Sequence, residues 1–154
     1  MKIESANGPE INGWQAWKPV STIMRKDVPT VSADCSGAAL TAIFAGVSPA
    51  IALVVDAGGE PIGIVLGKSL DVNAATAAAT MEPVAFTLSE WVPISLAAAL
   101  MASAGVNEIP IVAAARDAVG VLTARDILAW VARQAGHRII DSGTRTETTQ
   151  PRNR

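Results

Sequence analysis

The sequence predicts an α/β fold, of the mixed α+β kind, built from two pseudo-symmetric repeats with the order strand, helix, strand, strand, helix. This order occurs twice without a gap. Met24 and Met81, like Gly63 and Gly120, are separated by the same 57 residues. In each half, an apolar run is followed by a turn and a second apolar run, as in a buried hairpin. A period that occurs only twice indicates a pseudo-symmetric pair rather than a solenoid.

The first repeat is expected at residues 21–79, after an N-terminal arm at 1–20. Cap-type residues from Ser32 to Ser36 precede its first helix, and Gly58 and Gly59 can adopt the positive φ of a hairpin turn. The predicted elements, in order, are a strand at 28–31, a helix at 37–45, strands at 50–55 and 61–66, and a helix at 68–79.

The second repeat is expected at residues 80–136 and follows the same order. Pro93 stands where a helix start tolerates proline, and Gly136 is a typical residue to end the last helix. The predicted elements are a strand at 84–88, a helix from Pro93 to Ala104, strands at 107–113 and 119–122, and a final helix that ends at Gly136. Residues 137–154 are rich in polar residues, and we predict a disordered tail there.

Composition narrows the classes of function. Hydrophobic residues make up 50% of the chain and charged residues 17%, so extensive burial is expected, including burial between chains. No uninterrupted apolar run approaches the roughly 20 residues of a membrane span. A net charge of -2 gives no general attraction to nucleic acid or anionic membrane. With no signal peptide at the start and a single cysteine, Cys35, we expect a cytoplasmic protein.

The four tryptophans are candidates for packing or for an interface. Trp14 and Trp17 have the spacing of one face of a helical turn, which favours anchoring the arm on the body or on a partner chain over stacking on a ligand. Trp91 and Trp130 are expected either to fill the core or to line a subunit interface.

The motif with the clearest chemistry runs from Gly120 to Leu128. An apolar run ends at Thr123, and Asp126 follows at the start of the predicted helix, so a hydroxyl and a carboxylate face one small space. Such a space suits a ribose and its phosphate. In the first repeat Leu66 and Ser69 occupy the equivalent positions, so that copy lacks both the hydroxyl and the acid.

Taken together, these features resemble a tandem pair of cystathionine-β-synthase (CBS) domains, the Bateman module. The resemblance covers residues 20–136. It implies two repeats packed sheet to sheet, with a cleft between them that contains two potential adenosine-nucleotide sites. The matching motifs are the Ile23-Met24 and Thr80-Met81 openings, the paired hairpins, and Gly120-x-x-Thr123-x-x-Asp126 running into Ile127-Leu128.

The resemblance also implies roles for individual residues. Asp126 would hold the ribose hydroxyls, and Thr123 would contact phosphate. The base would lie against Met81, Val84, Ala85 and Phe86 on one side and Asn107, Glu108 and Ile109 on the other. Glu108 stands where the family often has a small residue, and its charge or bulk opposes a polyphosphate. One site, in the second repeat, is therefore expected to be competent, and Asp126→Ala is expected to lose nucleotide affinity with little loss of folding.

We expect no enzyme, no metal site and no cofactor. The sequence contains no glycine-rich phosphate loop, HExxH or CxxC pattern, and the single histidine, His137, has no triad partners nearby. The main hypothesis is a regulatory module that senses AMP, ADP, ATP or S-adenosylmethionine and signals through a homodimer or a protein partner. The alternative is a ligand-free dimerisation module in which the alanine-rich helices at 95–104 and 124–135 pack against a second chain. Nucleic-acid binding through the arginines of the tail is a weaker third hypothesis.

Overall fold

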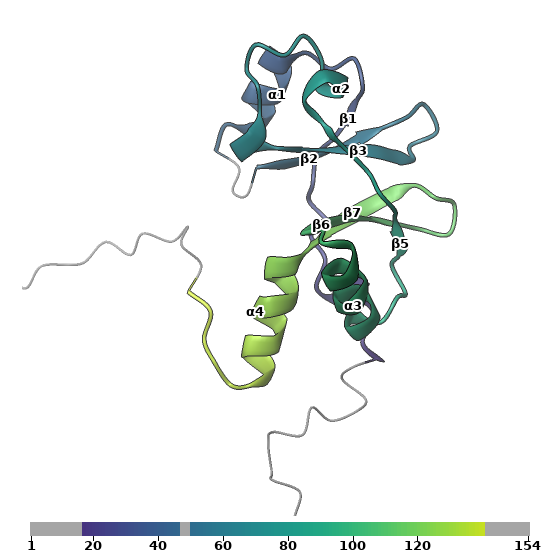
Figure 1. Cartoon of the computed structure of the whole chain (residues 1–154), viewed down its shortest axis with the longest axis vertical. Coiled ribbons are helices and arrows are strands. Elements are labelled where there is room, and N and C mark those ends of the chain that lie inside the picture. Colours follow the sequence, from purple (N-terminus) through teal and green to yellow (C-terminus); the bar gives the residue numbers. More distant parts are fainter. Residues whose placement is uncertain (1–16, 47–49, 141–154) are drawn as a thin grey trace, which may run out of the picture.

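The computed structural model describes residues 17–46 and 50–140. Two sheets lie face to face at the centre, and the helices of each repeat cover the outer face of its own sheet (Figure 1). The strand order is β1-β2-β3-β4 in the first sheet and β5-β6-β7 in the second. The predicted pair of α+β repeats is therefore confirmed. No helix in the described part of the chain is long and apolar enough to cross a membrane.

In the first sheet, β1 runs parallel to β2, and β2, β3 and β4 are antiparallel neighbours. Ser36 caps the first helix, because its hydroxyl accepts a 3.2 Å hydrogen bond from the Ala39 amide. The strands are β1 (Thr30–Ser32), β2 (Ile51–Val55), β3 (Pro61–Leu66) and β4 (Glu82–Pro83), and the helices are α1 (Gly37–Phe44), α2 (Ala77–Thr80) and the 3-10 turns Val20–Thr22 and Gly67–Ser69.

The second sheet repeats this pattern with a parallel pair β5 and β6 and an antiparallel pair β6 and β7. Its helices are longer, and the first of them ends at Gly105, whose φ of 66° is the left-handed conformation that favours glycine. The elements are β5 (Leu88–Ser89), β6 (Glu108–Val112), β7 (Ala118–Thr123), α3 (Ile94–Ala104) and α4 (Ala124–Gln134).

Alternate residues of the hairpin strands face two different cores. In β2, Ala52 and Val54 pack under α1, while Ile51 and Leu53 face the second sheet, where they meet Val121 of β7. Both sets are buried, which explains why β2 reads as a continuous apolar run rather than an alternating one. The sheet-to-sheet packing is thus carried by the inward faces of the two hairpins.

The segment that leads into each repeat pairs with the sheet of the other repeat. Arg25 exchanges two backbone hydrogen bonds with Val121 of β7, at 2.9 and 3.0 Å. In the same way β4, which leads into the second repeat, pairs with Gly63 and Ile64 of β3. A Cβ added at Gly120 would collide with the backbone oxygen of Arg25, so this crossing requires glycine.

The hairpin turns of the two repeats also touch each other. The Ala118 amide donates a 3.1 Å hydrogen bond to the Gly59 oxygen, and the Arg116 guanidinium lies 2.9 Å from the Glu60 carboxylate. Gly59 and Arg116 are equivalent positions in the two repeats, and both have positive φ, 84° and 70° respectively. The two turns therefore keep the same backbone shape although only one of them has glycine.

The second helix of the first repeat was predicted at 68–79, and this prediction is wrong. The structure has a 3-10 turn at Gly67–Ser69 and only the short α2. Between them the Asp71 carboxylate accepts a hydrogen bond from the Asn73 amide, at 2.9 Å, and so closes a local turn. Aspartate and asparagine favour such turns over a helix, and this preference overrides the alanine-rich sequence that follows.

The strand predicted at 84–88 is also wrong in its extent. Residues 84–87 form no strand, because this segment crosses from β4 in the first sheet to β5 in the second. The strand expected at 28–31 is shifted, since β1 begins at Thr30. Pro93 precedes α3 as its N-cap rather than forming its first turn.

The tryptophan predictions have mixed outcomes. Trp17 is 75% exposed, so it is not anchored in the core of the chain, and Trp14 lies outside the described residues. Trp130 packs against the core of the second repeat, whereas Trp91 is 70% exposed. The predicted tail is described only at 137–140, which form no helix or strand.

We predict that Gly120→Ala lowers the free energy of unfolding by about 1–3 kcal/mol, because the new methyl group forces Arg25 away from β7. Urea denaturation followed by circular dichroism measures this change. Gly58→Ala is the matched control, since its Cβ meets only the exposed side chain of Asp56. Equal unfolding midpoints for the two variants would show that the crossing at Gly120 tolerates a side chain.

Candidate ligand site between the repeats

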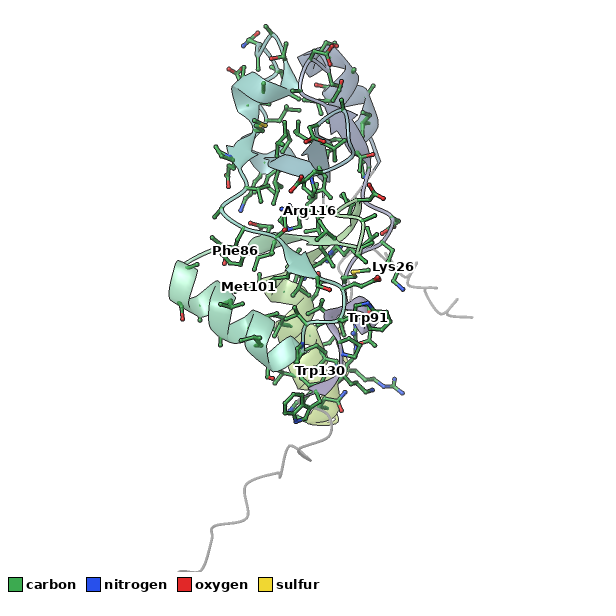
Figure 2. All side chains as sticks on the ribbon, turned by 90° about the vertical axis from the view of Figure 1, so that its right-hand side faces the viewer. Lys26, Phe86, Trp91, Met101, Arg116 and Trp130 are labelled. Carbon is green, nitrogen blue, oxygen red and sulfur yellow. The ribbon has the colours of Figure 1, made fainter. Side chains whose placement is uncertain are left out.

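A cavity of about 160 Å³ lies where the two repeats meet. One wall is the crossing segment between β4 and β5, and the other is the end of α3 with the start of β6. Figure 2 shows Phe86, from the crossing segment, at this junction. The lining residues are Ile64, Glu82, Pro83, Val84, Ala85, Phe86, Gly105, Val106, Asn107, Glu108, Ile109 and Pro110.

The crossing segment is held at both ends by packing. Val84 packs against the cluster between the sheets, and its amide donates a 3.2 Å hydrogen bond to the Ile62 oxygen. Phe86 packs against the core of the second repeat. Ala85 lies between these two anchors and is exposed. The cavity therefore has an apolar wall whose position depends on both repeats.

The charged groups that line this cavity are two carboxylates. Glu82 belongs to β4 and Glu108 to the first position of β6. Burial raises the pKa of Glu108, an effect that Lys68 partly offsets and Glu82 reinforces. The twelve lining residues include neither lysine nor arginine, so the cavity wall itself is negative at neutral pH.

Thr123 and Asp126 form a capping box at the start of α4. The Asp126 amide donates a 3.1 Å hydrogen bond to the Thr123 hydroxyl oxygen, while the Asp126 carboxylate accepts from the Thr123 amide at 3.0 Å and from its hydroxyl at 2.7 Å. Thr123 is only 6% exposed. The pair therefore has a structural role in starting the helix.

The Asp126 carboxylate is also bound by a residue that the sequence interpretation missed. The guanidinium of Arg25 approaches it with two nitrogens, Nη2 at 3.0 Å from Oδ1 and Nε at 3.2 Å from Oδ2. The side chains are 27% and 13% exposed, so water screens this contact only in part. A ribose that used both oxygens of Asp126 would compete with Arg25 for them.

The structure does not gather the nine candidate residues into one place. Six of them line the cavity: Val84, Ala85, Phe86, Asn107, Glu108 and Ile109. Thr123 and Asp126 are absent from its wall, although Thr123 is paired with Glu108 in the sheet. Met81 packs instead against the core of the first repeat.

The repeat symmetry was the signal that could have found Arg25. Arg25 and Glu82 are 57 residues apart and occupy equivalent positions in the two leading segments. Each leading segment crosses to the other repeat, so the segment that faces Asp126 is the one around Arg25 rather than the one around Glu82. A prediction that ignores this crossing combines Asp126 with the segment around Met81, although the two belong to different clefts.

Comparison with known families agrees with this architecture. The family profile described as the CBS domain matches residues 20–70 and 80–133. The chain belongs to the CBS domain family. The two matched regions make it a tandem CBS pair, the arrangement called a Bateman module. No curated protein sequence matches this CBS pair.

Solved structures of similar fold contain CBS pairs. The CBS domain of a membrane protein from Sphaerobacter thermophilus is 22% identical, with a TM-score of 0.64 over 75% of this chain and 89% of that one. CBSX2, solved in complex with AMP, is 18% identical, with a TM-score of 0.62 over 78% and 99% of the chains. The CBS pair of protein MJ0100, solved with 5′-methylthioadenosine and S-adenosyl-L-methionine, is 25% identical, with a TM-score of 0.61 over 76% and 98%.

The contacts of Asp126 change the expectation for Asp126→Ala. The substitution removes the reciprocal cap of α4 and leaves Arg25 without its carboxylate. We therefore predict a loss of about 2–3 kcal/mol in the free energy of unfolding, rather than little loss of folding. Urea denaturation tests this, with the exposed neighbour Arg125→Ala as the control. A parent-like midpoint for Asp126→Ala would mean that these contacts contribute nothing to stability.

Proposed function

We propose that this CBS pair is a noncatalytic regulatory module that binds an adenosine-containing small molecule in the cavity between its repeats. The observation that carries the proposal is the cavity itself, whose walls come from both repeats. Similar CBS pairs have been solved with AMP and with S-adenosyl-L-methionine. We place its action in the cytoplasm, in keeping with the free thiol of Cys35.

The chemistry of the cavity suits a purine nucleoside. Val84 and Phe86 offer apolar surface to a flat base, and the polar side chain of Asn107 offers both a donor and an acceptor. A ligand there contacts the crossing segment and the start of β6 together. Its binding would favour one relative arrangement of the repeats, and a partner protein or a second copy would respond to that shift.

Thr123 and Asp126 belong to the opposite cleft in this proposal. In its role toward ribose, which the family resemblance implies, Asp126 would be shared between the ligand and Arg25. Binding in the cavity and binding at Asp126 are therefore separate events, and variants of the two places distinguish them.

Isothermal titration with AMP, ADP, ATP and S-adenosylmethionine tests the proposal. We expect saturable binding of one ligand per chain in the parent and at least a tenfold loss in Ala85→Phe, because the larger side chain fills the cavity. Asp126→Asn is expected to retain the affinity of the parent for the cavity ligand.

Ala115→Phe is the matched control, since it adds the same ring at an exposed hairpin position outside the cavity. No binding of any of these compounds to the parent would refute the proposed function. Binding that is lost in Asp126→Asn and kept in Ala85→Phe would instead place the ligand in the cleft of Thr123 and Asp126.

A ligand-free dimerisation module is the second candidate, and the outer face of α3 and α4 favours it. An open apolar hollow of about 330 Å³ lies between these helices. Leu128 at its edge is 69% exposed, and Val131 one turn later is 44% exposed. Apolar side chains grouped in this way are typical of surfaces that associate. The small side chains of Ala98 and Ala102 in the hollow would allow a helix of a second copy to approach closely.

We predict that the parent is a dimer and that Leu128→Glu shifts it to monomer, because a buried carboxylate would oppose the contact. Size-exclusion chromatography with light scattering measures the molar mass. Arg133→Glu, on the same helix, is the control for the added negative charge and should remain dimeric. A dimer that survives Leu128→Glu would place the contact elsewhere.

A further inference from the structure

The two clefts between the repeats differ in charge at equivalent positions. Arg25 in the first leading segment corresponds to Glu82 in the second, and Ile51 at the start of β2 corresponds to Glu108 at the start of β6. The cavity wall therefore has two acidic groups, whereas at the equivalent positions the opposite cleft has the apolar Ile51 and Arg25, which is paired with Asp126. The two repeats therefore share a backbone arrangement but differ in the charge of the side chains at their clefts.

Both carboxylates belong to the wall of the cavity rather than to its surroundings. Glu82 lies on β4 and Glu108 on β6, so they line the cavity from two strands. Glu108 is partly buried and Glu82 is exposed. Burial raises the pKa of Glu108, Lys68 lowers it, and the repulsion from Glu82 raises it by less than Lys68 lowers it. Added negative charge in this space would increase that repulsion.

We propose that Glu82 and Glu108 make the cavity selective for an adenosine compound whose 5′ substituent carries a positive charge, over adenosine phosphates. This inference rests on the proposed function, because it assumes that the cavity is the adenosine site. A sulfonium or ammonium group is attracted by both carboxylates. A phosphate group adds about two negative charges to the same space, and both carboxylates repel it.

Lys68 is the cation that could reverse this preference. It acts on Glu108 electrostatically, but it is exposed on the 3-10 turn after β3 and does not line the cavity. An exposed ammonium is screened by water and salt, whereas Glu108 is partly removed from water. The same screening applies to Glu82, which is also exposed, and Lys68 has a larger effect than Glu82 on the pKa of Glu108. Together the two carboxylates and the lysine still leave one net negative charge, and it is the carboxylates that line the cavity.

Two probes that differ by one methyl group on sulfur, and by the charge it creates, test the effect of charge. S-adenosylmethionine has a sulfonium, and S-adenosylhomocysteine has a neutral thioether in the same place. By isothermal titration at low salt we expect S-adenosylmethionine to bind about tenfold more tightly than S-adenosylhomocysteine, and AMP and ATP to bind more weakly than either. Added salt should reduce the difference between the first two.

Variants assign the selectivity to the two carboxylates. Glu108→Gln and Glu82→Gln are each expected to weaken S-adenosylmethionine about fivefold to tenfold, and to leave S-adenosylhomocysteine within about twofold. Glu90→Gln is the matched control, because this carboxylate lies before α3 and outside the cavity wall. Lys68→Ala should strengthen binding of S-adenosylmethionine.

The outcomes separate this inference from the proposed function. If AMP or ATP binds the parent more tightly than S-adenosylmethionine, the charge selectivity is refuted while the adenosine site stands, and loss of that preference in Lys68→Ala would assign it to the lysine. Equal binding of the two sulfur compounds in the parent also refutes it. If no adenosine compound binds the parent, the proposed function fails and this inference fails with it.

Discussion

The exchange of leading segments between the repeats is the constraint on which the rest of the structure depends. Arg25 pairs with β7 and β4 pairs with β3, so neither sheet is completed by its own repeat alone. Gly120 permits the first of these crossings, because a side chain there would meet the backbone of Arg25. The second crossing continues toward β5, and its irregular path leaves the cavity between the repeats.

The ion pair between Arg25 and Asp126 makes the two clefts chemically different. The Asp126 carboxylate, which the family resemblance assigns to ribose, is bound by Arg25 of the same chain. The cavity lies in the other cleft, where the first repeat has Leu66 and Ser69 in place of the hydroxyl and the acid. The pair Thr123 and Asp126 and the cavity are thus in different clefts. A matching sequence motif indicates which groups are present in a CBS pair, and the contacts of those groups decide whether a ligand can reach them.

Sequence patterns predicted the repeats, the two hairpins and the helices α1, α3 and α4, because these elements have strong apolar periodicity or clear turn residues. They failed at 68–79, where a single Asp71 to Asn73 turn outweighs a run of helix-forming alanines. In the candidate site, Thr123 and Asp126 have the spacing of a helix cap as well as that of a ligand pair, and spacing alone does not separate the two roles. The contact with Arg25 spans 101 residues and leaves no local trace in the sequence.

The hairpin turns join the two repeats at one end of their interface. Gly59 and Ala118 join the two repeats through the backbone just beyond the last residues of β6, whereas the cavity lies at the first residues of that strand. A strand of this length separates the two points by about 15 Å. Widening of the cavity would therefore rotate one repeat relative to the other about the joined turns.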